Sequence, residues 1–401
     1  MQKSIPLHHH QSTTENQYIT CKTRCMKPLA ALLLITMFTI SSASSQQIKP
    51  ENAKKIQVAI LLDVSGSMDG LIEQAKSQLW NMVTVLGKAQ CNGSSPKIEI
   101  ALYEYGRSTN DEKKGYIKQL SAFTSDLDLL SATLFGLKTD GGDEYCGHVI
   151  KTSIDDLSWD MSAGNYKVIF IAGNEDFLQG SIKFTNACAL AKQKGIIVNT
   201  IYCGDRMQGI KENWNLGGEC GNGSYTNINQ DAKEEEFNTP YDSIMYVYNS
   251  KLNATYIAYG EGGSANMERQ EAMDVQNAQL SKKAGLTRAA VKASRGLYDN
   301  RSWDLVDAYT SDSTILSKVN SNTLPENLRN KSKQQIKTAV KEKATQRAAI
   351  QKEIGRLNDL RNKYITAEKK KRASANASAT LETEMERIIR LQAKRYNMII
   401  Q

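Results

Sequence analysis

Apolar and polar positions follow two different periods along the first half of the chain. The runs 56–62 and 166–172 are apolar and rich in β-branched residues, which is typical of strands buried on both faces of a sheet. In 71–87 and 181–194, apolar side chains recur every three or four residues, which predicts amphipathic helices. The same two patterns predict further strands at 97–103, 195–202 and 224–228, and further helices at 127–135 and 149–157.

This alternation of strands and helices favours an α/β fold: a doubly wound, mostly parallel sheet with helices on both faces. We place this domain at residues 54–230. Ligands of such sheets bind beyond the carboxyl ends of the strands. Asp63, Gly173 and Cys203 each stand at the end of a predicted strand, so we expect them at one edge of the sheet.

The pattern changes after the α/β domain. Residues 231–265 are polar, as in a linker, and residues 266–401 are rich in Ala, Lys and Glu with a helical period. In this helical tail, a long helix followed by a shorter one predicts a helical hairpin over 332–399. Lys343 and Arg347 interrupt the apolar face, which argues against a long coiled coil.

The first 45 residues have the pattern of a secretory signal. A short apolar run, 28–40, follows Lys27 and precedes small residues, with cleavage expected near 43–46. The run is too short for a bilayer core of about 30 Å. Residues 1–25 are polar, so either translation starts at Met26 or the leading segment is long. We therefore expect an exported chain, periplasmic or secreted, without a transmembrane span.

Composition excludes several classes of protein. Of 401 residues, 40% are hydrophobic, which is enough for a core and excludes wholesale disorder. Three of the four histidines are residues 8–10, so His148 stands alone in the rest of the chain and His-rich zinc sites are disfavoured. Residues 331–401 carry 18 Lys and Arg against 7 Asp and Glu, whereas residues 46–330 carry 29 against 35. The basic segment either packs on the acidic body or meets an anionic partner. Nucleic acid is not expected for an exported chain.

Five cysteines follow the signal segment, an odd number that leaves at least one thiol free. Their spacing does not fix the pairing. We expect a bridge that involves Cys203 and Cys220, because both fall near one end of the predicted fold.

The strongest chemical signal is Asp63-Val-Ser65-Gly-Ser67, between a predicted buried strand and a predicted helix. A carboxylate and two hydroxyls at alternating positions offer hard oxygen ligands, which suit Mg²⁺, Ca²⁺ or Mn²⁺. With few carboxylates around it, the cation keeps its affinity for a further carboxylate from outside. The motif contains no nucleophile–base pair, so we expect a binding site and not an enzyme.

On this motif the chain resembles the von Willebrand factor type A (vWA) domain family, whose metal-ion-dependent adhesion site (MIDAS) begins with Asp-x-Ser-x-Ser. The resemblance covers about residues 54–230 and includes the predicted strands and the loop 141–144. It implies that Asp63, Ser65 and Ser67 form the first ligand loop. In the second loop it implies Asp143, with Thr139 as the alternative.

The third loop departs from the family pattern. The family usually places an Asp at the end of this strand, followed by Gly, and here Gly173 takes that position; Glu175 or Asp176 are possible substitutes. The resemblance implies cation-dependent binding of a protein partner through an acidic side chain. The departure leaves an alternative open, a scaffold with a non-functional metal site that acts through its basic helical tail.

The chain also resembles a group of exported bacterial proteins that join such a domain to an Ala- and Lys-rich helical tail. The segments 173–175, 195–204 and 302–307 carry this likeness. It implies architecture and compartment only, since it brings no activity with it.

Overall fold

The computed structural model describes residues 54–91, 93–232, 236–372 and 380–400. The expected signal segment 1–45, with the alternative start at Met26, lies outside these residues. Among the described helices, none is long and apolar enough to cross a membrane.

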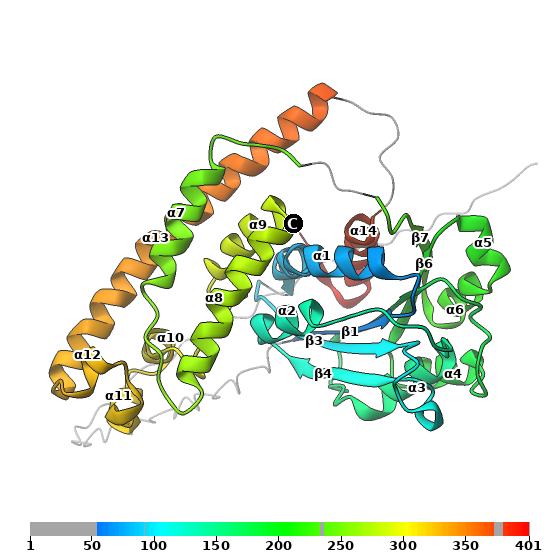
Figure 1. Cartoon of the computed structure of the whole chain (residues 1–401), viewed down its shortest axis with the longest axis horizontal. Coiled ribbons are helices and arrows are strands. Elements are labelled where there is room, and N and C mark those ends of the chain that lie inside the picture. Colours follow the sequence, from blue (N-terminus) through cyan, green and yellow to red (C-terminus); the bar gives the residue numbers. More distant parts are fainter. Residues whose placement is uncertain (1–53, 92, 233–235, 373–379, 401) are drawn as a thin grey trace, which may run out of the picture. The chain divides into compact units, whose positions relative to one another are not determined.

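The centre of the α/β domain is a six-stranded sheet with the order β4-β3-β1-β5-β6-β7 (Figure 1). The edge strand β4 runs antiparallel to β3, and every other neighbouring pair is parallel. The predicted doubly wound, mostly parallel α/β fold is therefore confirmed. The strands are β1 (Lys55–Asp63), β3 (Lys97–Tyr105), β4 (Lys118–Thr124), β5 (Tyr166–Gly173), β6 (Ile197–Cys203) and β7 (Asn222–Ile228).

Helices cover both faces of this sheet, which explains why its central strands are apolar on both sides. In β1, Val58 and Ile60 point into one core, and Ala59 and Leu61 point into the other. The first face is covered by α1 (Asp69–Gly87), α2 (Leu127–Phe135) and α14 (Leu381–Ala393), and the second by α3 (Cys146–Asp156), α4 (Phe184–Gln193) and α6 (Trp214–Cys220), with the short α5 (Arg206–Lys211) after β6.

The last helix of the chain belongs to the α/β domain. Apolar side chains of α14 join the core on the α1 face, and α14 packs against α1 and β7 (Figure 1). Gln74 on α1 accepts a hydrogen bond from the backbone N–H of Leu381 at 3.0 Å. After α14, the short strand β8 (Met398–Ile400) pairs antiparallel with β2 (Ala89–Cys91). The residues expected as the second arm of a hairpin thus complete the sheet domain instead.

The helices between β7 and α14 form an insertion in the chain order of this domain. The stretch 231–265, expected as a linker, contains helix α7. Helix α13 packs against α7 and α10, while α9 packs against α1. The helices of the insertion are α7 (Asp242–Asn253), α8 (Gly263–Leu280), α9 (Lys282–Lys292), α10 (Leu305–Ser311), α11 (Ile315–Lys318), α12 (Glu326–Arg329) and α13 (Lys333–Arg372). Within the described residues, the 3₁₀ turns are η1 (Glu112–Lys114), η2 (Ser321–Thr323) and η3 (Lys394–Tyr396).

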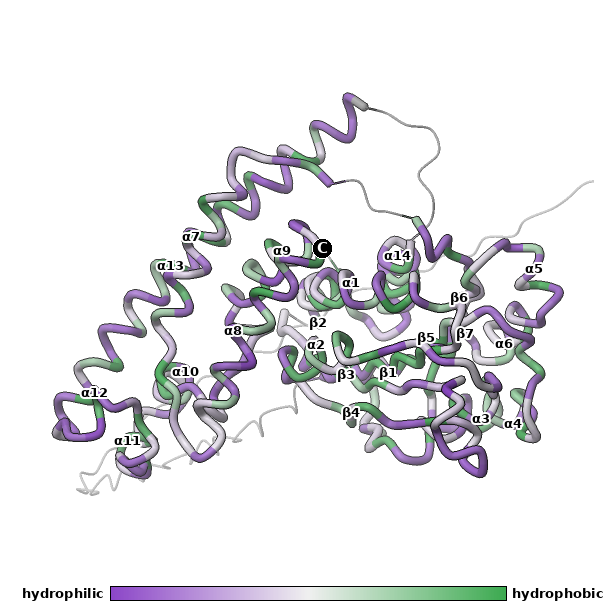
Figure 2. The backbone as a smooth tube through the Cα atoms, viewed as in Figure 1, coloured by the Kyte–Doolittle hydropathy of each residue, from purple (hydrophilic) through white to green (hydrophobic). Residues whose placement is uncertain are grey.

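Buried charges join these helices to one another. Arg347 on α13 is 2% exposed and pairs with Asp304 and Asp307, and its guanidinium also donates to the backbone O of Thr255 at 2.7 Å. Figure 2 shows α13 as a largely hydrophilic helix, and Arg347 is one reason that its apolar face is interrupted. At Arg347 the interruption noted in the sequence is therefore a buried ion pair, whereas Lys343 donates to the backbone O of Ala254 at 2.8 Å.

A second buried network joins the insertion to the sheet domain. Arg288 on α9 pairs with Asp128 on α2 and, at 2.6 Å, with Asp274 on α8. Lys292, also buried, lies 2.6 Å from the same Asp274 carboxylate. The Arg288 guanidinium stacks over the ring of Trp80 on α1, 4.6 Å from its centroid. Because buried charges are costly unless paired, this network holds α9 in one position on the domain.

Candidate metal-binding site

The first loop of the candidate site is a tight turn between β1 and α1. The backbone N–H of Val64 donates to Tyr105 O at 3.0 Å, which continues the pairing with β3. The N–H of Ser65 donates to Asp63 Oδ1 at 2.8 Å, and the N–H of Met68 donates to Ser65 O at 3.1 Å. This turn buries Asp63 and Ser65 and leaves Ser67 exposed.

Two oxygens of this loop are buried without a hydrogen-bond partner among the described residues: Asp63 Oδ2 and Ser65 Oγ. Burial raises the pKa of Asp63 to about 6, although nearby Ser65 and the backbone N–H of Asn174 oppose the shift. An unpaired buried carboxylate costs free energy unless something compensates its charge. The first loop therefore fits a divalent cation, which would pair with both oxygens.

The second loop is held against the first by its backbone. The N–H of Asp140 donates to Val64 O at 2.8 Å. Thr139, the alternative second-loop ligand, donates its hydroxyl to Asp69 Oδ1 at 2.5 Å, at the start of α1. Asp143, the preferred ligand, is exposed and accepts a hydrogen bond from the Tyr145 hydroxyl at 3.0 Å. Both residues thus lie in the expected loop, with these protein groups as their partners.

Glu144, which the sequence did not single out, is buried beside Asp63. Burial, followed by the charges of Asp63, Glu175 and Asp143, raises the pKa of Glu144 to about 8. Gly106 makes the approach possible: a Cβ there would lie 2.9 Å from Glu144 Cγ and 3.0 Å from Asp63 Oδ1. Its φ of +82° also favours glycine. The sequence pattern does not distinguish Glu144 from its neighbour Asp143, so only the fold identifies Glu144 as a residue of the site.

The third loop cannot carry a side chain at its first position. A Cβ at Gly173 would lie 2.5 Å from Tyr105 Oη and 2.9 Å from Asp63 Oδ2. The next residue, Asn174, takes over the contact with the first loop, because its Nδ2 lies 3.2 Å from Ser67 Oγ. The side-chain amide of Asn174 thus lies against Ser67, with its Oδ1 slightly farther from Ser67 Oγ, at 3.5 Å.

The two substitutes proposed for the third loop differ in their surroundings. Glu175 is exposed, and its charge raises the pKa values of Asp63 and Glu144, so its carboxylate lies toward the site. Asp176 Oδ1 instead accepts from the backbone N–H of Leu178 at 3.0 Å and from Asn213 Nδ2 at 3.1 Å. Asp176 therefore shapes the loop, and Glu175 is the better placed of the two acids.

The raised pKa of Glu144 predicts how stability depends on pH without metal. Between pH 4.5, the ordinary pKa of the group, and about pH 8, Glu144 keeps a proton in the folded chain that it has lost in the unfolded chain. The fold therefore loses stability as pH rises through that interval. With chelator present, we expect wild type to lose on the order of 1–2 kcal/mol relative to Glu144→Gln between pH 5 and pH 8.5. Urea unfolding at both pH values measures it.

Glu268→Gln, which removes an exposed acid on α8, is the matched control and should follow the wild-type pH profile. If the free energy of unfolding depends on pH in the same way in wild type and Glu144→Gln, then burial does not raise the pKa of Glu144 as its surroundings indicate.

The cysteine prediction is wrong in its pairing. All five described cysteines are free thiols, so no bridge joins Cys203 to Cys220. Cys203 is buried at the end of β6, where its sulfur neighbours the backbone of Gly173.

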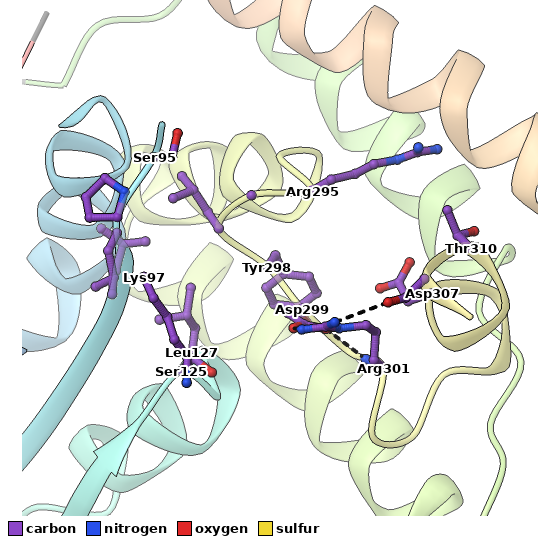
Figure 3. A pocket seen from close by; sticks show the side chains of 16 residues that line it. Ser95, Lys97, Ser125, Leu127, Arg295, Tyr298, Asp299, Arg301, Asp307 and Thr310 are labelled. Atoms are coloured by element: carbon purple, nitrogen blue, oxygen red, sulfur yellow. Dashed lines mark hydrogen bonds and ion pairs between the residues drawn. The ribbon is translucent and has the colours of Figure 1, made fainter. Parts of the chain in front are cut away.

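A separate cavity of about 440 Å³ lies near the amino end of β3, where Lys97 begins the strand, and so at the opposite end from Tyr105. Figure 3 shows Arg301 beside Asp299 in its wall. Lys97 pairs with Glu99 at 2.8 Å, so Lys97 and Arg301 already have acidic partners. The cavity contains none of the predicted site residues. In the described ranges, no group of three His, Cys, Asp or Glu side chains could hold a metal, so a cation site at Asp63 must use hydroxyl and amide oxygens as well.

Comparison with known proteins gives structural likeness only. No protein-family model and no curated protein matches the sequence. Proximal thread matrix protein 1 from the mussel byssus is 12% identical with a TM-score of 0.34, over 45% of this chain and 43% of that one, so the match spans less than half of the mussel protein. A second structure of that protein has a zinc-occupied MIDAS motif.

Two further structures are similar over most of their own length. The SpRpn10 VWA domain is 13% identical with a TM-score of 0.33, over 43% of this chain and 87% of that one. An aerotolerance-related membrane protein from Bacteroides fragilis is 16% identical with a TM-score of 0.32, and the match covers 44% of this chain and 93% of that one. The strand order, the antiparallel edge strand and the helices on both faces give this chain a vWA fold.

Proposed function

We propose that this protein is an exported binding protein whose vWA domain presents a divalent cation to an acidic side chain of a protein partner. The observation that carries the proposal is the pair of buried oxygens without partners, Asp63 Oδ2 and Ser65 Oγ, at the carboxyl edge of the sheet. Exposed Ser67 and partly exposed Asn174 stand next to them, so the position is open to a partner.

In this proposal Asp63, Ser65 and Ser67 hold the cation from the first loop, with Asn174 and the carboxylate of Glu144 or Asp143 as further oxygen donors. The set is oxygen-only, which favours Mg²⁺, Ca²⁺ or Mn²⁺. When bound, the cation supplies a positive charge that attracts a carboxylate. The chain's own acids at this edge would otherwise repel such a partner.

We propose no enzymatic activity for the site. His148 is the one histidine within the described residues, and its Nε2 lies 3.2 Å from Ser181 Oγ. Its Nδ1 is buried without a hydrogen-bond partner in that part of the chain, so no acid orients the imidazole as a general base. The hydroxyls of the first loop therefore serve better as ligands than as nucleophiles.

Calorimetric titration of the metal-free protein with Mn²⁺ and Mg²⁺ tests the proposal. We expect one site, and a cation at 100 times its Kd should stabilise the fold by about 2.7 kcal/mol. Asp63→Ala removes the charged ligand and should weaken binding about 100-fold or more. Glu112→Ala, which removes an exposed acid on η1, should leave the affinity within about twofold.

The third loop offers a matched pair of variants for the same titration. Asn174→Asp places a carboxylate beside Ser67 Oγ and should tighten Mn²⁺ binding about tenfold. Gly173→Asp restores the residue usual in the family but collides with Tyr105 and Asp63, so it should weaken both binding and folding. Wild type that shows neither heat nor thermal shift with either cation would overturn the proposed function.

The alternative function, a scaffold acting through its basic helices, has one observation in its favour. Lys341, Lys352, Lys363 and Lys370 are exposed on α13 and fall within about 40° of one another around the helix axis, at 100° per residue. This face could bind an anionic partner without any cation. Partner capture that survives chelator but is lost on replacing these four lysines by Gln would favour the scaffold.

A further inference from the structure

Two thiols on neighbouring helices face each other behind the third loop. Cys188 Sγ on α4 lies 3.7 Å from the backbone O of Gly217 on α6. Gly217 precedes Cys220 by three residues in the same helix, so the two share a helix face. The Cys220 thiol also contributes to the raised pKa of Cys188, which places the two thiols near each other, and α4 packs against α6.

We propose that Cys188 and Cys220 form a disulfide bond when the protein meets an oxidising environment, and that this bond braces the third loop. The proposal does not depend on the cation. It replaces the pairing expected from the sequence, because the fold places Cys188, and not Cys203, against Cys220.

The surroundings of the two thiols set the order of the reaction. Cys188 is completely buried, and burial raises the pKa of its thiol, so few of these groups are thiolates. Cys220 is partly exposed and meets the oxidant first. Its thiolate attacks a small-molecule or protein disulfide, which forms a mixed disulfide and releases one thiol.

Cys188 then attacks the Cys220 sulfur of the mixed disulfide, and the proton of its thiol passes to the departing thiolate. The second thiol of the oxidant leaves, and the Cys188–Cys220 bond forms. Two protein thiols are oxidised and one external disulfide is reduced to two thiols, so the exchange balances.

The bond would join the two helices that hold the third loop in place. The ring of Phe177 contacts Phe184 on α4 at 5.5 Å and Trp214 on α6 at 5.0 Å between centroids. Trp214 Nε1 donates to Glu175 O at 2.7 Å, and the N–H of Phe177 donates to Glu212 O at 2.9 Å. Fixing α4 to α6 therefore fixes the base of the loop that carries Asn174.

The reaction should be selective. Cys146 is buried beside the Tyr105 hydroxyl, 4.0 Å from its oxygen, and Cys203 lies against the backbone of Gly173. Cys91 lies on β2, in the other hydrophobic core. These three thiols should therefore stay reduced.

Peptide mapping tests the pairing directly. The folded full chain is treated with oxidised glutathione, alkylated and digested with trypsin, which cuts after Lys and so releases peptides 184–192 and 212–233. We expect these two peptides to be linked, and to separate on reduction. Recovery of both peptides fully alkylated, or a link from Cys188 to another cysteine, would overturn the proposal.

Thermal unfolding tests the brace. The bond closes a loop of about 30 residues and should raise the unfolding midpoint of the oxidised protein by about 5 °C or more, an increase that reductant removes. Cys220→Ser, at the partly exposed position, should fold and lose this difference, whereas Cys91→Ser should keep it. If the oxidised protein contains the Cys188–Cys220 bond but its unfolding midpoint is unchanged, the bond forms as proposed but does not stabilise the fold.

Discussion

Replacing Ile388 by Asp should unfold the α/β domain, although the residue lies 160 positions beyond the last strand of the main sheet, which ends at Ile228. Ile388 is 0% exposed in the core that α14 shares with α1 and the sheet. Burying an Ile side chain stabilises a fold by about 1.5–3 kcal/mol, and burying an unpaired carboxylate adds a larger penalty. We expect a loss above about 4 kcal/mol, a large part of a typical total.

Leu391 provides the matched control on the same helix. Its side chain is 51% exposed, so Leu391→Asp should change stability by less than about 0.5 kcal/mol. Urea unfolding followed by tryptophan fluorescence measures both variants, because Trp80 lies in the affected core. Equal effects at the two positions would mean that α14 is not docked on the sheet.

The second large effect is expected at Arg288. Its guanidinium is 1% exposed and pairs with Asp128 and Asp274, so Arg288→Ala leaves acidic groups buried without their cation. Removing one partner of a buried pair typically costs about 3–5 kcal/mol. We expect a loss in this range in urea unfolding, together with easier proteolysis of α8 and α9.

A surface pair in the same region is the comparison. Arg269 binds Asp126 at 2.7 Å with both side chains partly exposed, so Arg269→Ala should cost less than about 1 kcal/mol. The double variant Arg288→Met with Asp128→Asn should recover part of the loss, because it removes the uncompensated charge. If the double variant is no more stable than Arg288→Ala, packing and not charge explains the role of Arg288.

The sheet could be predicted from the sequence because each strand carries its own signal. The run 56–62 is apolar on both faces and became β1, and the Asp-x-Ser-x-Ser turn followed where the pattern placed it. Strand β4 was missed because it lies at the edge and its polar residues lack the pattern of a buried strand. Local periodicity therefore reported the elements and the first loop well.

Partners distant in sequence could not be predicted in this way. The apolar face of α14 could be predicted from the sequence. Periodicity does not say, however, whether this face packs against α13 or against a sheet whose last strand lies about 150 residues earlier in the chain. The burial of Arg288 and Arg347 could not be predicted either, since their acidic partners come from other helices. Glu144 and Asn174 were missed for the same reason: what matters at each is the space left by Gly106 or Gly173, which only the folded chain reveals.

The position of α14 in the chain also limits how early during synthesis the α/β domain can complete its hydrophobic core. Ribosomes add about 5–20 residues per second, so roughly ten to thirty seconds separate β7 from the helix that seals its sheet. During that time the part of this face that α14 covers, next to α1 and β7, lacks its final helix. The core on this face of the sheet can therefore be completed only after residues 381–393 have been synthesised.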